Sequence, residues 1–176
     1  MGKARPPQKV KLVAGLLASD TALFARAAAL LERALRNKVD FESRVADFSH
    51  TDYYAEEMGP GLKRRFISFE KVVDPADLYK VKLVTNRLER RLSSGGKRKI
   101  NIDPGYLDLS KLVLFSTKDY SHRIYLRKGV YAEVTLFYRD HAFNPWPWTY
   151  PDYKTPEYKE IFDGIRNTYK KQTGHI

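Results

Sequence analysis

The chain has 176 residues, of which 43% are hydrophobic and 30% charged, and it carries a formal net charge of +11 but no cysteine. This length and mixture are typical of one globular domain with a buried core, so we expect a single domain over residues 1–176. The absence of cysteine excludes a disulfide scaffold, a thiolate nucleophile and any zinc site with sulfur ligands.

The positive charge is unevenly distributed along the chain. Residues 1–38 carry a net charge of +6 and residues 61–99 carry +8, whereas residues 39–60 between them carry −5. An excess of positive charge attracts polyanionic partners, although it also serves solubility alone. The longest apolar run near the N-terminus, residues 12–18, is too short to cross a bilayer, so we expect a cytoplasmic protein without a membrane partner.

Hydrophobic periodicity in the first part of the chain indicates alternating strands and helices. Asp74 followed by Pro75 gives one of the helices a capping residue and an N-terminal proline. The turn-forming triplet Asp103-Pro104-Gly105 is expected to end the last strand of this part. The predicted elements are a strand, a helix, two strands, a helix and a strand over residues 9–17, 21–36, 41–48, 62–72, 75–92 and 97–103.

The second part of the chain begins with an ambiguous run, residues 108–117. Asp108 suits the N-cap of a short buried helix, which we favour, but the apolar residues 112–115 suit a buried strand equally well. Two strands, residues 122–126 and 130–138, follow and are joined as a tight hairpin. A terminal helix is expected over residues 156–170. These elements predict an α+β fold: a ferredoxin-like βαββαβ core with an added C-terminal β-hairpin and a terminal helix.

No familiar catalytic signature is present, neither a phosphate-binding glycine loop nor a zinc-protease or serine-hydrolase motif. Between the last predicted strand and the terminal helix, the proline-rich segment NPWPWTYPDY is irregular. We interpret its aromatic residues as a lid packed over the core, and alternatively as a stacking surface for bases or a peptide. The aromatic residues of this segment are Trp146, Trp148, Tyr150 and Tyr153.

Polar residues alternate with apolar ones in three of the predicted strands, which places the polar ones on a single face of each strand. If these faces coincide, carboxylates and an arginine gather there and perturb one another's pKa values, as in functional sites. The alternative is an ordinary exposed sheet face with cross-strand ion pairs. The candidate residues are Asn101, Asp103, Arg123, Tyr125, Glu133 and Thr135.

The acidic insert around residues 50–57 is a second candidate. His50, Asp52 and Tyr53 lie there with Glu57, and an imidazole beside carboxylates can bind a metal or share acid–base chemistry. The alternative is a solvated loop whose polar side chains bond nearby backbone groups. We expect the insert to fold towards Asp103, so that His50 or Asp52 joins Asp103 or His122 in one composite site.

Four segments carry a resemblance to a known family: TDYYAEEMGPGLKRRFISFE (51–70), NIDPGYLDLSKLVL (101–114), TKDYSHRIYLRKGVYAEVTLFY (117–138) and PWTYPDY (147–153). Together they resemble the prokaryotic domain of unknown function family 4416. The resemblance covers nearly the whole chain. It implies a free-standing protein of one domain, and it implies no activity, cofactor or catalytic residue, because none is established for the family.

The residues themselves favour a small enzyme or binding protein that acts on a phosphate-bearing ligand, a nucleotide or an RNA fragment, at the polar sheet face. Asp103 and Glu133 would act as acid–base groups or as ligands of Mg²⁺, which prefers oxygen donors. Arg123 and His122 would hold the anion. The alternative is a non-catalytic RNA-binding module, in which Tyr125 and neighbouring aromatic residues would stack on bases.

Overall fold

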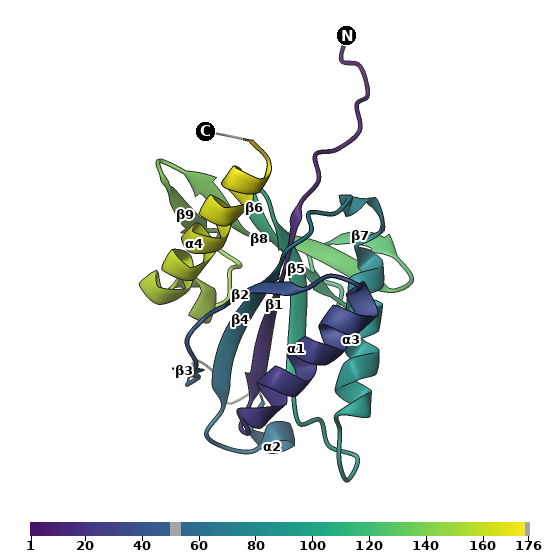
Figure 1. Ribbon diagram of the computed structural model, residues 1–176, viewed down its shortest axis with the longest axis vertical. Helices are drawn as coiled ribbons and strands as arrows, with labels where there is room; N and C mark the ends of the chain where they lie inside the picture. The colour runs from purple at the N-terminus through teal and green to yellow at the C-terminus, as the bar shows by residue number, and fades with distance from the viewer. Residues whose placement is uncertain (50–53, 175–176) are drawn as a thin grey trace.

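The computed structural model describes residues 1–49 and 54–174 and contains one antiparallel sheet with helices on both faces (Figure 1). The strands are β1 (Lys11–Ala18), β2 (Val39–Glu42), β3 (Ala46–Asp47), β4 (Lys63–Phe69), β5 (Asn101–Leu107), β6 (Lys111–Ser116), β7 (Ile124–Arg127), β8 (Val130–Arg139) and β9 (Ala142–Pro145). The helices are α1 (Ala22–Leu35), α2 (Ala55–Met58), α3 (Tyr79–Arg91) and α4 (Pro156–Gln172), with 3-10 turns at Pro75–Asp77 and Asp152–Lys154. None of the described helices is long and apolar enough to span a membrane.

The strand order is β2-β4-β1-β5-β6-β8-β7, with β3 paired to β4 and β9 paired to β8. This confirms the α+β class, but the sheet is larger than a simple βαββαβ core with one added hairpin. β3 and α2 are inserted between β2 and β4, and β6 and β9 are additional strands. The predicted hairpin forms between β7 and β8, where Lys128 and Gly129 both have the positive φ of a two-residue hairpin turn.

Two predictions about β5 and β6 are wrong. Residues 108–117, favoured as a helix, contain β6, which lies between β5 and β8. Both faces of β6 are covered, and two-sided burial removes the alternation of polar and apolar residues that marks a half-exposed strand. The triplet Asp103-Pro104-Gly105, expected to end a strand, lies inside β5.

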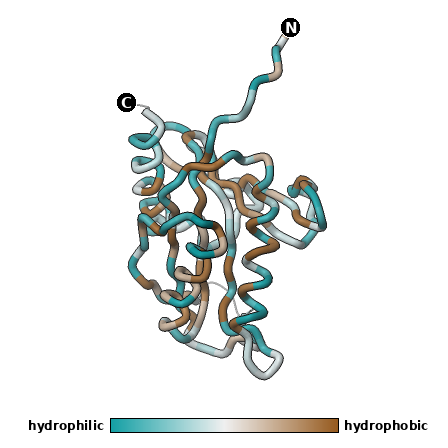
Figure 2. The backbone as a smooth tube through the Cα atoms, turned by 45° about the vertical axis from the view of Figure 1, so that its right-hand side comes forward, coloured by the Kyte–Doolittle hydropathy of each residue, from teal (hydrophilic) through white to brown (hydrophobic). Residues whose placement is uncertain are grey.

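Different elements cover the two faces of the sheet. Helices α1 and α3 lie side by side on one face, here called the α1/α3 face, and bury Leu12, Leu16 and Ile102 beneath them (Figure 1). Helix α4 packs on the opposite face, here called the α4 face, against Val13 and Phe66. Because β1 is covered on both faces, all of its residues are buried. Figure 2 shows the apolar residues along the strands, while the segment preceding β1 is largely hydrophilic.

The α4 face is covered in two separate patches. Helix α4 covers one of them, and a small cluster around Leu17, Phe48 and Met58 closes the other beneath α2. The Arg64 side chain from β4 lies between the patches, with its guanidinium 4.9 Å from the Phe48 ring centroid and 5.8 Å from that of Phe66. The space between the two apolar patches is therefore polar, and it is where the candidate residues gather.

Candidate functional site

Strands β5 and β6 separate from each other part of the way along the sheet. They pair only from Gly105 to Leu107, opposite residues 112–114, although β5 begins at Asn101 and β6 continues to Ser116. On their other sides the same strands stay paired, β5 with β1 and β6 with β8. The sheet is therefore split between β5 and β6 at one end.

At the split, backbone groups of β5 form hydrogen bonds with side chains of α3 instead of with a neighbouring strand. The Ile102 N–H donates to Glu89 Oε1 at 2.7 Å, and the Ile102 carbonyl accepts from Lys82 Nζ at 3.2 Å. Backbone groups two residues apart point to the same side of a strand, so the nitrogen of Pro104 faces the split, as the Ile102 N–H does. Proline has no N–H to donate there. Pro104 therefore stands inside β5 without removing a hydrogen bond to β1.

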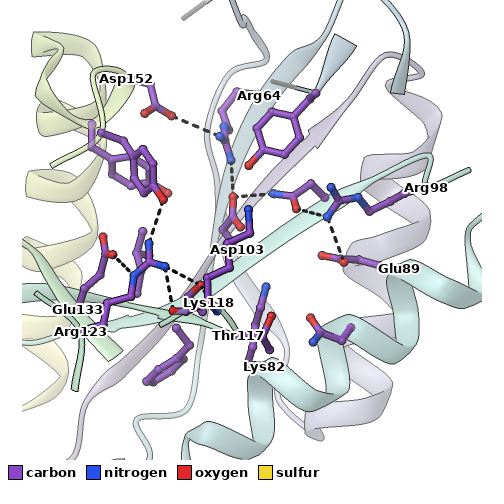
Figure 3. Close-up of a pocket in the computed structure, with 18 of the residues that line it drawn as sticks. Arg64, Lys82, Glu89, Arg98, Asp103, Thr117, Lys118, Arg123, Glu133 and Asp152 are labelled. Carbon is purple, nitrogen blue, oxygen red and sulfur yellow. Dashed lines mark hydrogen bonds and ion pairs between the residues drawn. The ribbon is translucent and has the colours of Figure 1, made fainter. Parts of the chain in front are cut away.

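A cavity of about 660 Å³ lies at this split. It is lined from both faces of the sheet, because side chains of α3 reach it from one face and those of β4 and the segment before α4 reach it from the other. We call it the split-sheet cavity. The charged lining residues in the described part of the chain are Arg64, Lys82, Glu89, Arg90, Arg98, Asp103, Lys118, Arg123, Glu133 and Asp152. Figure 3 shows how most of them point towards one another.

Arg64 organises the floor of the cavity on the α4 face. Its Nη1 donates to Asp103 Oδ2 at 3.2 Å and its Nη2 donates to Asp152 Oδ2 at 3.3 Å (Figure 3). Only 3% of the Arg64 side chain is exposed, against 27% for Asp103. Asn101 Nδ2 adds a second donor to Asp103 Oδ2 at 2.7 Å. Asp103 is thus the carboxylate of this network that faces the open part of the cavity.

The ionisation of Asp103 follows from these neighbours. Burial alone would raise its pKa, but the positive charges of Arg64 and Lys82 and the hydrogen bonds from Asn101 and Arg64 bring the pKa below its ordinary value. Glu89 differs, because burial outweighs the charge of Lys82 and the hydrogen bond from the Ile102 N–H and raises its pKa. The cavity therefore contains an ionised Asp103 at neutral pH.

A second network lies on β8 and holds Arg123. Arg123 Nε donates to Glu133 Oε2 at 2.8 Å, and its Nη2 donates to the Tyr150 hydroxyl at 2.9 Å. Thr135 donates to the other Glu133 oxygen at 3.1 Å, and His122 Nε2 lies 3.2 Å from Oε2. Glu133 is 3% exposed, so in this structure it anchors Arg123.

The described part of the acidic insert reaches the same cavity, as expected. Tyr54 lines it, and Glu57 Oε2 accepts from Arg98 Nη2 at 2.7 Å. Arg98 Nη1 in turn donates to Asn101 Oδ1 at 2.8 Å, which ties the insert to the start of β5. The other candidate residues of the insert, His50, Asp52 and Tyr53, lie outside the described residues.

The polar residues predicted to share a sheet face are divided by the structure. Asn101, Asp103, Arg123 and Glu133 line one cavity as the alternation predicted. The other two lie away from its lining: Thr135 is fully buried, and Tyr125 is 58% exposed against Tyr131 at the sheet edge. His122, expected separately to hold the anion, also lies outside the lining and stacks on Trp148 at 5.4 Å. The platform is therefore smaller and deeper than predicted.

Several lining residues were not singled out from the sequence. Arg64, Lys82, Glu89 and Arg98 come from β4, α3 and the segment before β5, and only the tertiary fold brings them together. A usable signal was present in α3, where Lys82 and Glu89 directly follow two apolar stripe residues, Val81 and Leu88, and the structure buries both charged side chains. Charged side chains are rarely buried unless they have partners, so such positions point to a network. Among the described residues, no group of three or more histidine, aspartate or glutamate side chains is placed to hold a metal ion.

The fold and the cavity define an α+β protein with a split antiparallel sheet and a polar cavity at the split. Over residues 8–169 the chain matches the family described as a domain of unknown function (DUF4416), and it belongs to that family. No curated protein and no solved structure matches it. The resemblance seen in the sequence is thereby confirmed.

Proposed function

We propose that this protein binds a phosphate-bearing ligand, a nucleotide or an RNA fragment, in the split-sheet cavity. The observation that carries the proposal is the charge of the lining, in which, among the described residues, six cationic side chains face four carboxylates. A net positive, partly enclosed cavity of about 660 Å³ has the size and sign that suit a small anion with an organic part.

The cations of the cavity differ in how strongly the protein already uses them. Arg64 and Arg123 are held by carboxylates, as described above. Lys82 donates to a neutral carbonyl, and Arg90 is exposed and makes no ion pair with the described residues. Lys82 and Arg90 both belong to α3, so we place the phosphate on that side of the cavity, where charge-assisted hydrogen bonds are open to it.

The carboxylates then have separate roles in the proposal. Glu133 positions Arg123, whereas the ionised Asp103 faces the ligand as an acceptor or a general base. Mg²⁺ commonly binds through one or two carboxylates together with substrate phosphates. Asp103 is the residue that would contact a Mg²⁺ ion brought by the ligand.

Ligand-dependent stabilisation tests the proposal. Inorganic phosphate, pyrophosphate and AMP are titrated into the protein while its thermal unfolding is followed; a ligand at a hundred times its Kd stabilises the folded state by about 2.7 kcal/mol. Arg90→Ala is expected to weaken the effect, whereas Arg26→Ala removes the same charge from the exposed surface of α1 and leaves it unchanged. If no phosphate compound stabilises the wild type, or if the two variants behave alike, the proposal is wrong.

The RNA-binding alternative has one observation in its favour, a set of exposed aromatic side chains, of which Tyr150 lines the cavity, Tyr120 lies beside Arg123 and Tyr125 lies on β7 at the sheet edge. Tyr120, Tyr125 and Tyr150 are 66%, 58% and 49% exposed, and bases of single-stranded RNA stack on such rings. The central strand β1 contains no aromatic residue, which counts against the usual sheet surface for RNA. This alternative predicts salt-dependent binding of single-stranded RNA that Tyr125→Ala weakens, and absence of binding at low salt would exclude it.

We also infer that β1, α1, β2, β4, α3 and β5 form a ferredoxin-like unit within the larger sheet. Their spatial order β2-β4-β1-β5, the antiparallel pairing and the position of α1 and α3 on one face support this inference. The split then lies at the edge of that unit, where β6 is added to it.

A further inference from the structure

Two polar atoms on the floor of the split-sheet cavity, Asp103 Oδ1 and the Tyr153 hydroxyl oxygen, have no hydrogen-bond partner among the residues that the structure describes. Asp103 uses Oδ2 for both of its hydrogen bonds, and its Oδ1 makes none with the described residues. The Tyr153 hydroxyl is buried and likewise has no hydrogen-bond partner among them. Tyr153 is only 3% exposed, and burying a hydroxyl without a partner is costly. Such a group at a cavity wall indicates a ligand atom that completes it.

Gly15 keeps these groups close together. It pairs with Asp103 across the β1–β5 ladder, and a Cβ at this position would lie 3.0 Å from Arg64 Nη1 and 3.4 Å from the Tyr153 hydroxyl oxygen. The guanidinium that binds Asp103 and the Tyr153 hydroxyl therefore approach the same point above β1. Because Gly15 has no side chain, Arg64 and Tyr153 can approach the backbone of β1 at this position.

The chemistry of the two groups selects what binds between them. Burial raises the pKa of Tyr153 well above its ordinary value despite the charge of Arg64, so its hydroxyl keeps its proton and donates it. Asp103 is ionised and only accepts. A ligand hydroxyl satisfies both, because it donates to Asp103 and accepts from Tyr153. A phosphate oxygen is repelled by Asp103, and an ammonium group has no lone pair to accept the Tyr153 proton.

We propose that the ligand is a sugar phosphate, either free or as the ribose phosphate of a nucleotide, with a sugar hydroxyl bound between Asp103 and Tyr153. This inference rests on the proposed function, which places the phosphate on the α3 side near Lys82 and Arg90. One ligand can place its phosphate near α3 and its hydroxyl near Asp103 and Tyr153, because the cavity is lined from both faces of the sheet at the split. A ligand with a hydroxyl-bearing ring and a phosphate matches the acceptor and donor pair on the floor and the cations opposite.

Calorimetric titration of the full chain with ribose 5-phosphate, glucose 6-phosphate and inorganic phosphate tests this. We expect at least one sugar phosphate to bind at least about tenfold more tightly than inorganic phosphate, since sites built to hydrogen-bond a hydroxyl discriminate strongly against ligands that lack it. Tyr153→Phe removes only the donor, and we expect it to weaken the sugar phosphate several-fold while inorganic phosphate is unaffected. Tyr138→Phe, which removes a tyrosine hydroxyl outside the cavity lining, serves as its control.

Asp103→Asn provides the second variant. Because Arg64 and Asn101 both donate to Oδ2, the amide oxygen of the new side chain takes that side and its NH₂ faces the cavity, replacing an acceptor by a donor. We expect sugar phosphate affinity to fall at least about tenfold, as for loss of a hydrogen bond to a charged group. If Asp103→Asn does not fold, Tyr153→Phe still decides. Inorganic phosphate that binds as tightly as both sugar phosphates overturns this inference but not the proposed function. Absence of binding by all three compounds and by AMP overturns this inference, and the proposed function falls with it if pyrophosphate also fails to bind.

Discussion

Replacement of Arg64 by methionine probes the buried network that forms the cavity floor. Arg64→Met keeps a long apolar stem but leaves Asp103 and Asp152 without their shared cation. The three side chains are 3%, 27% and 7% exposed, so the ion pairs are largely shielded from solvent. Removal of one partner from a buried ion pair costs about 3–5 kcal/mol, and we expect the free energy of unfolding to fall by an amount in this range at pH 7.

The loss should depend on pH, and its sign follows from Asp103. In the wild type the lowered pKa stabilises the folded state above the unfolded pKa, and this stabilisation is lost as pH falls through the folded pKa. In Arg64→Met burial remains while the main opposing charge is gone, so the pKa of Asp103 moves above its ordinary value. The folded variant then takes up a proton before the unfolded chain does, and its stability rises as pH falls from 7 towards about 4.5.

Urea unfolding at pH 7 and pH 4.5 measures both effects. We expect the difference in free energy of unfolding between wild type and Arg64→Met to be smaller at pH 4.5 by about 1 kcal/mol or more, since each pKa unit corresponds to about 1.4 kcal/mol. The adjacent Arg65→Met is the control, because the Arg65–Glu42 pair is 26% and 44% exposed and should be worth at most about 1 kcal/mol. A loss for Arg64→Met no larger than for Arg65→Met, or one independent of pH, would refute the reasoning.

Three further substitutions test the fold around the site by equilibrium unfolding. Gly105→Ala places a Cβ 2.1 Å from the Val113 carbonyl oxygen in β6, so we expect a loss above about 3 kcal/mol or failure to fold, and a near-neutral result would contradict the close approach of β5 and β6. Gly164→Ala meets no atom within 4 Å inside α4 and should instead stabilise the protein by about 0.5–1 kcal/mol, the helix propensity difference; destabilisation would argue against this environment. Thr155→Ala removes the side-chain cap that accepts from the Tyr158 N–H at the start of α4 and should cost about 1 kcal/mol, whereas no change would show that the cap is dispensable.

Much of the local structure was predictable because periodicity and capping act over short distances. The terminal helix, predicted over 156–170, extends from Pro156 to Gln172 behind a threonine cap and an N-terminal proline. The β7–β8 hairpin follows from the turn residues between two alternating strands. Asn101 and Asp103 were placed on one face because strand alternation requires it, and the structure brings both into the cavity.

What the sequence did not predict depends on distant parts of the chain. Pro104 indicated a turn, yet it is tolerated within β5 because its missing N–H faces the split, and the split is satisfied by α3 side chains. Residues 112–115 looked equally like a helix or a strand because neighbours on both sides bury them. The role of Arg64 could not be read locally either, since its partners Asp103 and Asp152 are far away in sequence.

The split has a mechanical consequence for the sheet. Between β5 and β6 the two halves are joined by a seam of only three residue pairs, from Gly105–Leu114 to Leu107–Leu112. Helix α3 braces this seam from one side, through Lys82 and Glu89 to β5 and through Tyr79, whose ring lies 6.0 Å from the Arg127 guanidinium at the end of β7. The two parts of the sheet are thus joined along a short seam, which α3 braces on one face while α4 packs on residues from both parts on the other face. Small rotations about the seam would change the width of the cavity while the ladders within each part stay intact.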